Sequence, residues 1–348
     1  MSSAERPYRA VSSSSGKREL GRGERVVPGL WRLRLPLPWP GIPHVNAWAI
    51  AAGDGIVLVD CGMHLAAADS RPDSLSQLEH AMAQVGLRLD QVRQLVITHA
   101  HTDHWGQAAT VIGRSGCEMW MHPNYEHATA ERDQASLASH WAEIARQSGV
   151  PAQLFETYVA RTQDSPSGIA LVVAPDHQLV AGATIDTDLG GWEVYETPGH
   201  APSHVCLFQP EHRIMISGDH LLGRVSLYYD YGWTPDPVAE YLSSLELVDR
   251  LDARLCLSGH GRPFTDVHAH VVATRERVTE RLEKIISALA VAPSTAADLI
   301  PALYELPLNE HTSPWFLSET LCMLTHLECS GRILREQRDG IERWRLEA

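Results

Sequence analysis

The chain has 348 residues, of which 44% are hydrophobic and 21% are charged, and its formal net charge is −14. This composition is that of a globular protein with one large core domain and room for a small second one. The acidic balance disfavours general binding to nucleic acid or to anionic membranes, since both need a basic surface, and no run of about 18 apolar residues predicts a membrane span.

The first 25 residues are polar and rich in serine, and we expect them to form a disordered tail. They lack the apolar segment that a secretory signal needs, which favours a cytoplasmic location. Six cysteines are scattered along the chain without a C-x-x-C pair. In a chain of this kind they are expected to be reduced and mostly buried.

Short apolar runs then predict strands over residues 30–37, 45–51 and 56–59. The third run is continuously apolar and ends at Asp60, a pattern typical of a strand buried on both faces. A helix over 74–85 and a strand over 95–98 follow. The segment 124–163 has a helical pattern, and we interpret it as an insertion that lies over the functional site.

Strand signals return over 192–197, 205–208 and 214–217, and a helix over 238–251 precedes a strand over 255–257. The order of strands, helix and strands occurs twice. It suggests an α+β fold with two packed sheets between outer helices, a four-layer αββα sandwich, although periodicity alone does not separate this from other α/β folds.

The character of the chain changes after about residue 265. Five apolar residues recur at helical spacing: Val271, Val278, Leu282, Ile285 and Leu289. Helices over 296–304 and 316–330 and a hairpin turning at Asp339-Gly340 complete the outline of a winged-helix domain over 269–348. Residues 271–348 hold 9 basic and 12 acidic side chains. We therefore expect a structural role or a homodimer contact rather than nucleic-acid binding.

The sequence Thr-His99-Ala-His101-Thr-Asp103-His104 follows the strand over 95–98. His99 and His101 are two residues apart, so in extended chain they point to the same side and can share a metal ion. Asp103 and His104 come where the chain turns into a helix and can face a second ion. This density of imidazole and carboxylate groups predicts a metal site.

Three further ligand-type residues, His200, Asp219 and His260, each stand on a glycine-bearing loop directly after a predicted strand. Glycine permits close approach of the backbone, and loops at strand ends are where a rigid scaffold presents functional groups. Asp60 also follows a strand.

Taken in order, these residues resemble the five sequence motifs of the metallo-β-lactamase superfamily, over about residues 26–265. The resemblance implies a catalytic domain over 26–268 with the αββα fold. It implies that His99, His101 and His200 bind a first metal, and that Asp103, His104 and His260 bind a second. Asp219 would bridge both metals and Asp60 would orient ligands from behind.

Imidazoles and carboxylates suit zinc, so we expect two zinc ions per chain, with iron and manganese also compatible. Two metals that share one water lower its pKa and supply a hydroxide nucleophile. Asp103 and Asp219 are the carboxylates we assign to catalysis. Asp219 stands where one major class of true β-lactamases has cysteine, and His101 stands where diiron flavoproteins have glutamate.

With its appended domain, the chain is similar to the glyoxalase II-like group. More closely, it resembles lactamase-like proteins that include polyketide-releasing thioesterases and a mitochondrial endoribonuclease. We therefore expect hydrolysis of an acyl thioester, activated ester or lactone on a small molecule or carrier. RNA phosphodiester hydrolysis is the alternative, and the acidic charge disfavours it. Trp105, Tyr228, Tyr229 and Trp233 are candidates for an acyl pocket or for plain packing. Apolar residues of segment 124–163, among them Trp141, Ile144, Val150, Leu154, Phe155 and Tyr158, are further candidates to cover an acyl chain.

Four other histidines carry weaker signals. His122 is expected to be structural and His64 not to be a ligand. His204 and His220 flank ligand positions, where support of the ligands and simple packing are about equally favoured.

Overall fold

A computed structural model describes residues 21–39, 41–67, 72–129, 134–163, 167–306, 309 and 313–347 of the chain. Most of the predicted tail, residues 1–20, lies outside this range. The tail was predicted to extend to residue 25, and this boundary is wrong, because Arg22–Val27 forms strand β1 and pairs with β2. No helix in the described ranges is long and apolar enough to cross a membrane.

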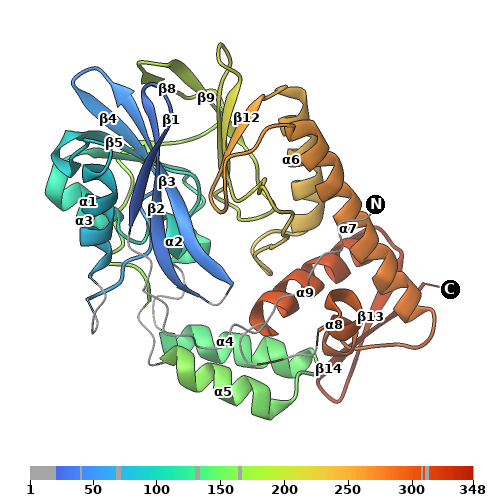
Figure 1. The fold of residues 1–348 in the computed structure, drawn as a ribbon. Helices are drawn as coiled ribbons and strands as arrows, with labels where there is room; N and C mark the ends of the chain where they lie inside the picture. The colour runs from blue at the N-terminus through green and yellow to red at the C-terminus, as the bar shows by residue number, and fades with distance from the viewer. Residues whose placement is uncertain are drawn as a thin grey trace.

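Two sheets form the centre of the molecule (Figure 1). The first holds, in order, β1 (Arg22–Val27), β2 (Leu30–Trp39), β3 (Ile42–Ala52), β4 (Gly55–Val59), β5 (Val92–Ile97), β6 (Glu118–Met121) and β7 (His177–Gln178). The second holds β12 (Leu255–Ser258), β11 (Ile214–Gly218), β10 (Val205–Gln209), β9 (Gly190–Glu196) and β8 (Thr184–Thr187). The strands from β4 to β7 are parallel, as are β11 and β12.

Side chains alternate between the two faces of these strands. In β4, Val57 and Val59 pack into the core between the sheets, while Ile56 and Leu58 pack into the core on the outer face. In β10, Val205 and Leu207 face inward and Cys206 and Phe208 face outward. Successive side chains of a strand point to opposite faces of the sheet, so a strand that is apolar on both faces indicates that both faces are covered. The predicted αββα sandwich is therefore confirmed.

Helices cover the two outer faces. The outer core of the first sheet includes residues of α1 (Ser74–Ala83), of the short helix α2 (Thr102–Trp105) and of α3 (Ala108–Ser115). Helix α6 (Pro237–Arg250) packs on the second sheet through Val238, Leu245 and Val248. The cysteines of the described chain are free, and all but Cys329 are buried, as predicted.

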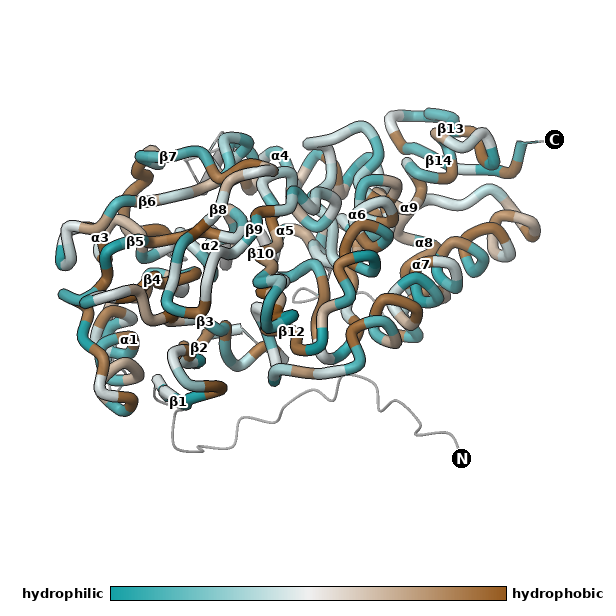
Figure 2. Tube along the Cα trace, turned by 90° about the horizontal axis from the view of Figure 1, so that it is seen from above, coloured by the Kyte–Doolittle hydropathy of each residue, from teal (hydrophilic) through white to brown (hydrophobic). Residues whose placement is uncertain are grey.

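The C-terminal part consists of α7 (Val267–Leu289), α8 (Ala296–Tyr304), α9 (Ser313–Cys329) and the hairpin β13–β14 (Ile333–Arg338 and Ile341–Leu346). The predicted order of three helices and a hairpin is thus present. Helix α7 alternates hydrophobic and hydrophilic residues along its length (Figure 2). Its buried apolar residues belong to the same core as those of α6, so this part packs on the αββα sandwich.

Segment 124–163 contains a short 3-10 helix, η2 (Glu126–Ala128), then α4 (Gln134–Gln147) and α5 (Ala152–Gln163). Apolar residues of α4, α5 and their link pack into the core shared with the C-terminal part; they are Trp141, Ile144, Ala145, Val150, Leu154 and Phe155. The Ala297 amide of α8 donates to the Ser148 carbonyl between the two helices. These residues therefore pack against the C-terminal part, where Trp141, Ile144 and Leu154 remain partly exposed, and their role in covering an acyl chain stays a prediction. The side chain of Tyr158 lies outside those the structure describes.

Glu319 of α9 is a buried carboxyl group in this core. Its Oε1 atom lies 3.9 Å from Arg281 Nη1, too far for a direct hydrogen bond. Burial raises the pKa of Glu319 to about 7, against the opposing effects of Arg281 and Tyr304. A carboxyl whose pKa is higher in the folded protein than in the unfolded chain takes up a proton on folding. Its contribution to stability is therefore lost as the pH rises through the folded pKa.

We expect Glu319→Gln to remove this pH dependence. Because glutamine does not ionise, the free energy of unfolding of the variant minus that of the wild type should rise by on the order of 2 kcal/mol between about pH 5 and about pH 8. Urea denaturation at each pH measures the difference. Glu283→Gln changes an exposed carboxylate of α7 paired with Arg332 and serves as the control. Parallel pH profiles for Glu319→Gln and wild type would contradict the assignment.

Candidate metal centre

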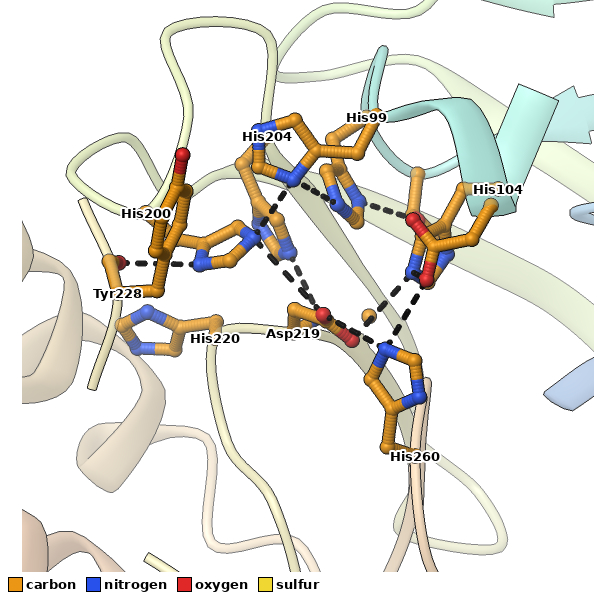
Figure 3. A network of polar contacts seen from close by, with 12 residues as sticks. His99, His104, His200, His204, Asp219, His220, Tyr228 and His260 are labelled. Atoms are coloured by element: carbon orange, nitrogen blue, oxygen red, sulfur yellow. Dashed lines mark hydrogen bonds and ion pairs between the residues drawn. The ribbon is translucent and has the colours of Figure 1, made fainter. Parts of the chain in front are cut away.

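The predicted ligands gather where the ends of parallel strands meet. Asp60 follows β4 and the His99 loop follows β5, and these strands are parallel neighbours. Asp219 follows β11 and His260 follows β12, which are parallel neighbours in the other sheet. His200 follows β9. Parallel strands end at one edge, so the loops of both sheets converge there, with Asp219 between His200 and His260 (Figure 3).

His99, His101 and His200 form the first ligand group. The Nδ1 atom of His101 lies 3.1 Å from His99 Nε2 and 3.1 Å from His200 Nε2. Three nitrogens around one tetrahedral zinc ion, each at 2.0–2.1 Å, are about 3.3 Å apart. The spacing of this group therefore matches that of three ligands of one ion.

Asp103, His104 and His260 form the second ligand group. His260 Nε2 lies 3.2 Å from Asp103 Oδ2. Asp219 is shared by the two groups: its Oδ2 is 3.1 Å from His260 Nε2 and 3.9 Å from His200 Nε2. This is the arrangement that the predicted bridging role of Asp219 requires.

In each histidine of the two groups, the ring nitrogen that points away from the centre is held by a hydrogen bond. His104 Nδ1 is 2.8 Å from Asp60 Oδ2 and His101 Nε2 is 2.9 Å from Asp230 Oδ2. His200 Nδ1 is 3.1 Å from the Tyr228 carbonyl. Carboxylate and carbonyl oxygens only accept, so these ring nitrogens donate.

The remaining two histidines follow the same rule. His260 Nδ1 donates to the His44 carbonyl at 2.9 Å, and His99 Nδ1 donates to Thr98 Oγ1 at 3.0 Å, because that hydroxyl itself donates to Asp60. In the neutral form of each ring, with its outer nitrogen protonated, the inner nitrogen carries a lone pair directed at the centre.

Against the effect of burial, neighbouring carboxylates raise the pKa of His101, His104 and His260, the last to about 10, so these rings favour a positive charge at the centre, from either a proton or a metal ion. Burial holds the pKa of His200 at about 4 and that of His99 well below its usual value, so both rings are neutral at pH 7. The buried atoms His104 Nε2 and Asp219 Oδ1 have no hydrogen-bond partner among the described residues, and they lie 3.5 Å apart. Donors of this kind fit a transition metal such as zinc.

Asp60 holds the second group from behind. It is buried and accepts from the Thr98 amide at 2.8 Å, from the Thr98 hydroxyl and from His104. Its φ of 61° lies in the left-handed region, which aspartate adopts more readily than bulky residues do. This conformation is what turns its carboxylate from the end of β4 toward the β5 loop.

Gly259 is required for the centre to close. A Cβ atom at this position would lie 2.1 Å from Asp219 Oδ1 and 2.7 Å from His104 Cε1. Neither neighbour can move without leaving its ligand position. The glycine of the His260 loop is thus there for close approach, as the sequence suggested.

Several supporting residues were not predicted. Asp230 bonds to His101 and also to His127, whose Nδ1 lies 3.0 Å from Asp230 Oδ2. Buried Asn46 donates through Nδ2 to the Ser258 carbonyl at 2.7 Å and holds the His260 loop. Each of these partners is far away in sequence and has no local motif, so the sequence carried no signal for them.

The two flanking histidines differ in role. His204 Nε2 accepts from the Asp219 amide at 3.1 Å while its Nδ1 donates to Thr197, so it holds the backbone of the residue that carries the shared carboxylate. His220 instead packs on the Tyr241 ring, with ring centroids 4.8 Å apart. His122 is buried and accepts from the Asn124 amide, as expected of a structural residue. His64 belongs to none of the ligand groups formed by the described residues.

Of the candidate pocket residues, Tyr228 borders the centre, with its ring centroid 5.7 Å from that of His101 and 5.6 Å from that of His200. Trp233 is 43% exposed and lies over His127. Trp105 and Tyr229 are 1% and 0% exposed. The structure therefore places these two in the core and not on a pocket wall.

Comparison with known proteins agrees with this arrangement. A family profile described as "Metallo-beta-lactamase superfamily" matches residues 40–260, and one described as "Metallo-beta-lactamase-like, C-terminal domain" matches residues 282–347. The crystal structure of a metallo-beta-lactamase family protein from Thermus thermophilus superposes with a TM-score of 0.76 and 25% identity, covering 93% of this chain and 100% of the other.

Among curated proteins, "Probable metallo-hydrolase YqjP" of Bacillus subtilis is 29% identical over 293 residues, which cover 79% of this chain and 86% of that protein. "Atrochrysone carboxyl ACP thioesterase" of Aspergillus chevalieri is 22% identical over 268 residues, covering 76% of this chain and 67% of that protein.

Proposed function

The chain belongs to the metallo-β-lactamase superfamily, and from this premise we propose that it hydrolyses an acyl thioester or a related activated ester at a centre of two metal ions. The observation that carries the proposal is the set of five histidines, each bonded from behind and each directing its other nitrogen at the centre. Zinc is the metal we propose, since imidazole and carboxylate donors suit it.

His99, His101 and His200 would hold the first ion, and Asp103, His104 and His260 the second, with Asp219 between them. Bound ions would supply an activated water and polarise the substrate carbonyl. The protein's own part is to fix the position of these groups: Asp60 accepts from His104, and His204 accepts from the backbone amide of Asp219. Fixed donors need no rearrangement as charge develops in the substrate.

The surroundings of the centre favour a substrate whose leaving group needs little protonation. The carboxylates are engaged with histidines, and both nitrogens of His127 are bonded, to Asp230 and to Ser203. A thiol has a pKa of about 8.5, so a thiolate leaves readily without a dedicated acid. The similarity to proteins named as acyl-carrier thioesterases supports the same choice.

We expect close to two equivalents of bound transition metal in protein purified without chelators. Each ligand group offers at least three donors within 4.8 Å of one another, which is enough to hold an ion. Elemental analysis by inductively coupled plasma mass spectrometry measures the content. A protein saturated by one equivalent, with no gain in activity on adding metal, would rule out the second ion.

The substrate class is tested by direct competition on one preparation. We expect hydrolysis of acyl-CoA or carrier-bound thioesters, lost on His101→Ala and retained on His268→Ala, which alters an exposed histidine that bonds Asp249. A lactone series and a structured RNA are offered in parallel. Efficient metal-dependent cleavage of RNA without turnover of thioester or lactone would overturn the proposal in favour of a nuclease.

A further inference from the structure

Asp230 connects two segments outside the sandwich, the insertion 124–163 and the C-terminal part, to the first ligand group. Its Oδ2 atom accepts from His101 Nε2 at 2.9 Å and from His127 Nδ1 at 3.0 Å. His127 comes from η2 in segment 124–163, and Asp230 comes from the loop before α6. One carboxylate oxygen therefore receives a ligand histidine from the sandwich and a second histidine from the insertion.

The same loop also holds a second ligand. The Tyr228 carbonyl accepts from His200 Nδ1, and the Asp230 amide donates to the His200 carbonyl at 3.2 Å. Residues 228–230 are thus bonded to two of the three histidines of the first group. The position of this short stretch sets where both rings point.

Helix α9 of the C-terminal part holds this stretch from the opposite side. The buried Ser318 hydroxyl donates to the Tyr229 carbonyl at 2.6 Å and accepts from the Tyr231 amide at 3.2 Å. One turn further, Cys322 contacts the same carbonyl, and after another turn His326 bonds Asp236 at the start of α6. Residues four apart share one face of a helix, so α9 lies along the loop.

The insertion completes the frame. His127 Nε2 lies 2.9 Å from Ser203 Oγ, and Ser203 Oγ accepts from the Ala100 amide, which lies between His99 and His101. The path from Asp230 through His127 therefore returns to the loop that carries the first ligands. Hydrogen bonds of this kind fix the orientation and basicity of a ligand imidazole.

We propose that Asp230 is the positioning residue of the first metal position, held in place by Ser318 of α9 and by His127 of the insertion. The appended segments thereby set the metal affinity of that position. The inference rests on the proposed function only in that two metal positions exist; it does not depend on which substrate is hydrolysed.

The test is a cobalt(II) titration of metal-stripped full-length protein, followed by the visible d–d absorption and by competition with a chelator. Asp230→Ala should weaken binding at one position by roughly 10- to 100-fold and change its spectrum, while the affinity of the other position stays within about twofold. His127→Ala and Ser318→Ala should shift the same position by smaller factors in the same direction.

Thr325→Ala is the matched control, since the Thr325 hydroxyl bonds only within α9, to the Leu321 carbonyl at 2.9 Å. It should leave both affinities unchanged. Asp230→Asn keeps the shape of the side chain and tests the charge if Asp230→Ala does not fold. Wild-type cobalt affinities and spectra in folded Asp230→Ala and Ser318→Ala would overturn the inference. A wild-type protein that binds two metals but cleaves no thioester would refute the proposed substrate and leave this inference standing.

Discussion

Asp219→Ala should lose bound metal at both positions and reduce turnover by roughly a hundredfold to a thousandfold, the order of loss that follows removal of one essential electrostatic group. Asp219 is the only described residue whose carboxylate lies within 4 Å of histidines from both ligand groups. Its removal also takes one carboxylate away from both His260 and His104, which leaves Asp103 near the two rings. A histidine ligand offers only its one inner nitrogen to an ion, so no single histidine variant should have an effect as large.

Elemental analysis and steady-state hydrolysis on the same preparation check this expectation. Asp186→Ala, which removes an exposed carboxylate of β8, is the control and should behave as the wild type. Retention of two metals and wild-type turnover by Asp219→Ala would show that Asp219 does not bridge.

Asp60→Asn should lower metal affinity at the second position by roughly 10- to 100-fold. The Asp60 carboxylate accepts three hydrogen bonds, from the Thr98 amide, the Thr98 hydroxyl and His104 Nδ1. An amide has one acceptor oxygen and an NH2 group that faces these donors, so His104 loses the bond that directs its Nε2 at the centre. Asparagine tolerates the left-handed backbone at this site, which keeps the change local.

Asp266 offers a matched control because its φ of 62° is nearly that of Asp60, while its side chain is exposed and belongs to none of the ligand groups formed by the described residues. Asp266→Asn should leave metal affinity unchanged. If Asp60→Asn binds metal as tightly as wild type, the orienting role of Asp60 is refuted.

The residues predictable from sequence were those with a local signature. His99, His101, Asp103 and His104 stand together after an apolar strand, and the remaining ligands stand beside glycines at strand ends. The alternation in β4 and β10 likewise follows from the apolar runs. These features can be predicted from the sequence because strand ends and ligand spacing depend on residues only a few positions apart.

The supporting residues could not be found in this way. Asp230 and His101 are 129 positions apart, and Ser318 and Tyr229 are 89 apart. Trp105 and Tyr229 are aromatic residues beside ligand loops, and the sequence does not say which side of its loop each ring takes. The packing of the apolar residues of α4 and α5 against the C-terminal part could not be predicted, because those neighbours are more than a hundred residues away in the sequence.

The ligands come from both sides of the sandwich. His99, His101, Asp103 and His104 follow a strand of the first sheet, whereas His200, Asp219 and His260 follow strands of the second. Each metal position draws on both sides. Bound ions would thus cross-link the two sheets, much as a disulfide cross-links two segments of chain. Without bound ions the two sheets would still pack through their shared apolar core, but the strand ends that carry the ligands would be free to separate. Local opening of the sandwich would then begin at these strand ends, so loss of metal would destabilise the proposed site of reaction before it destabilised the rest of the fold.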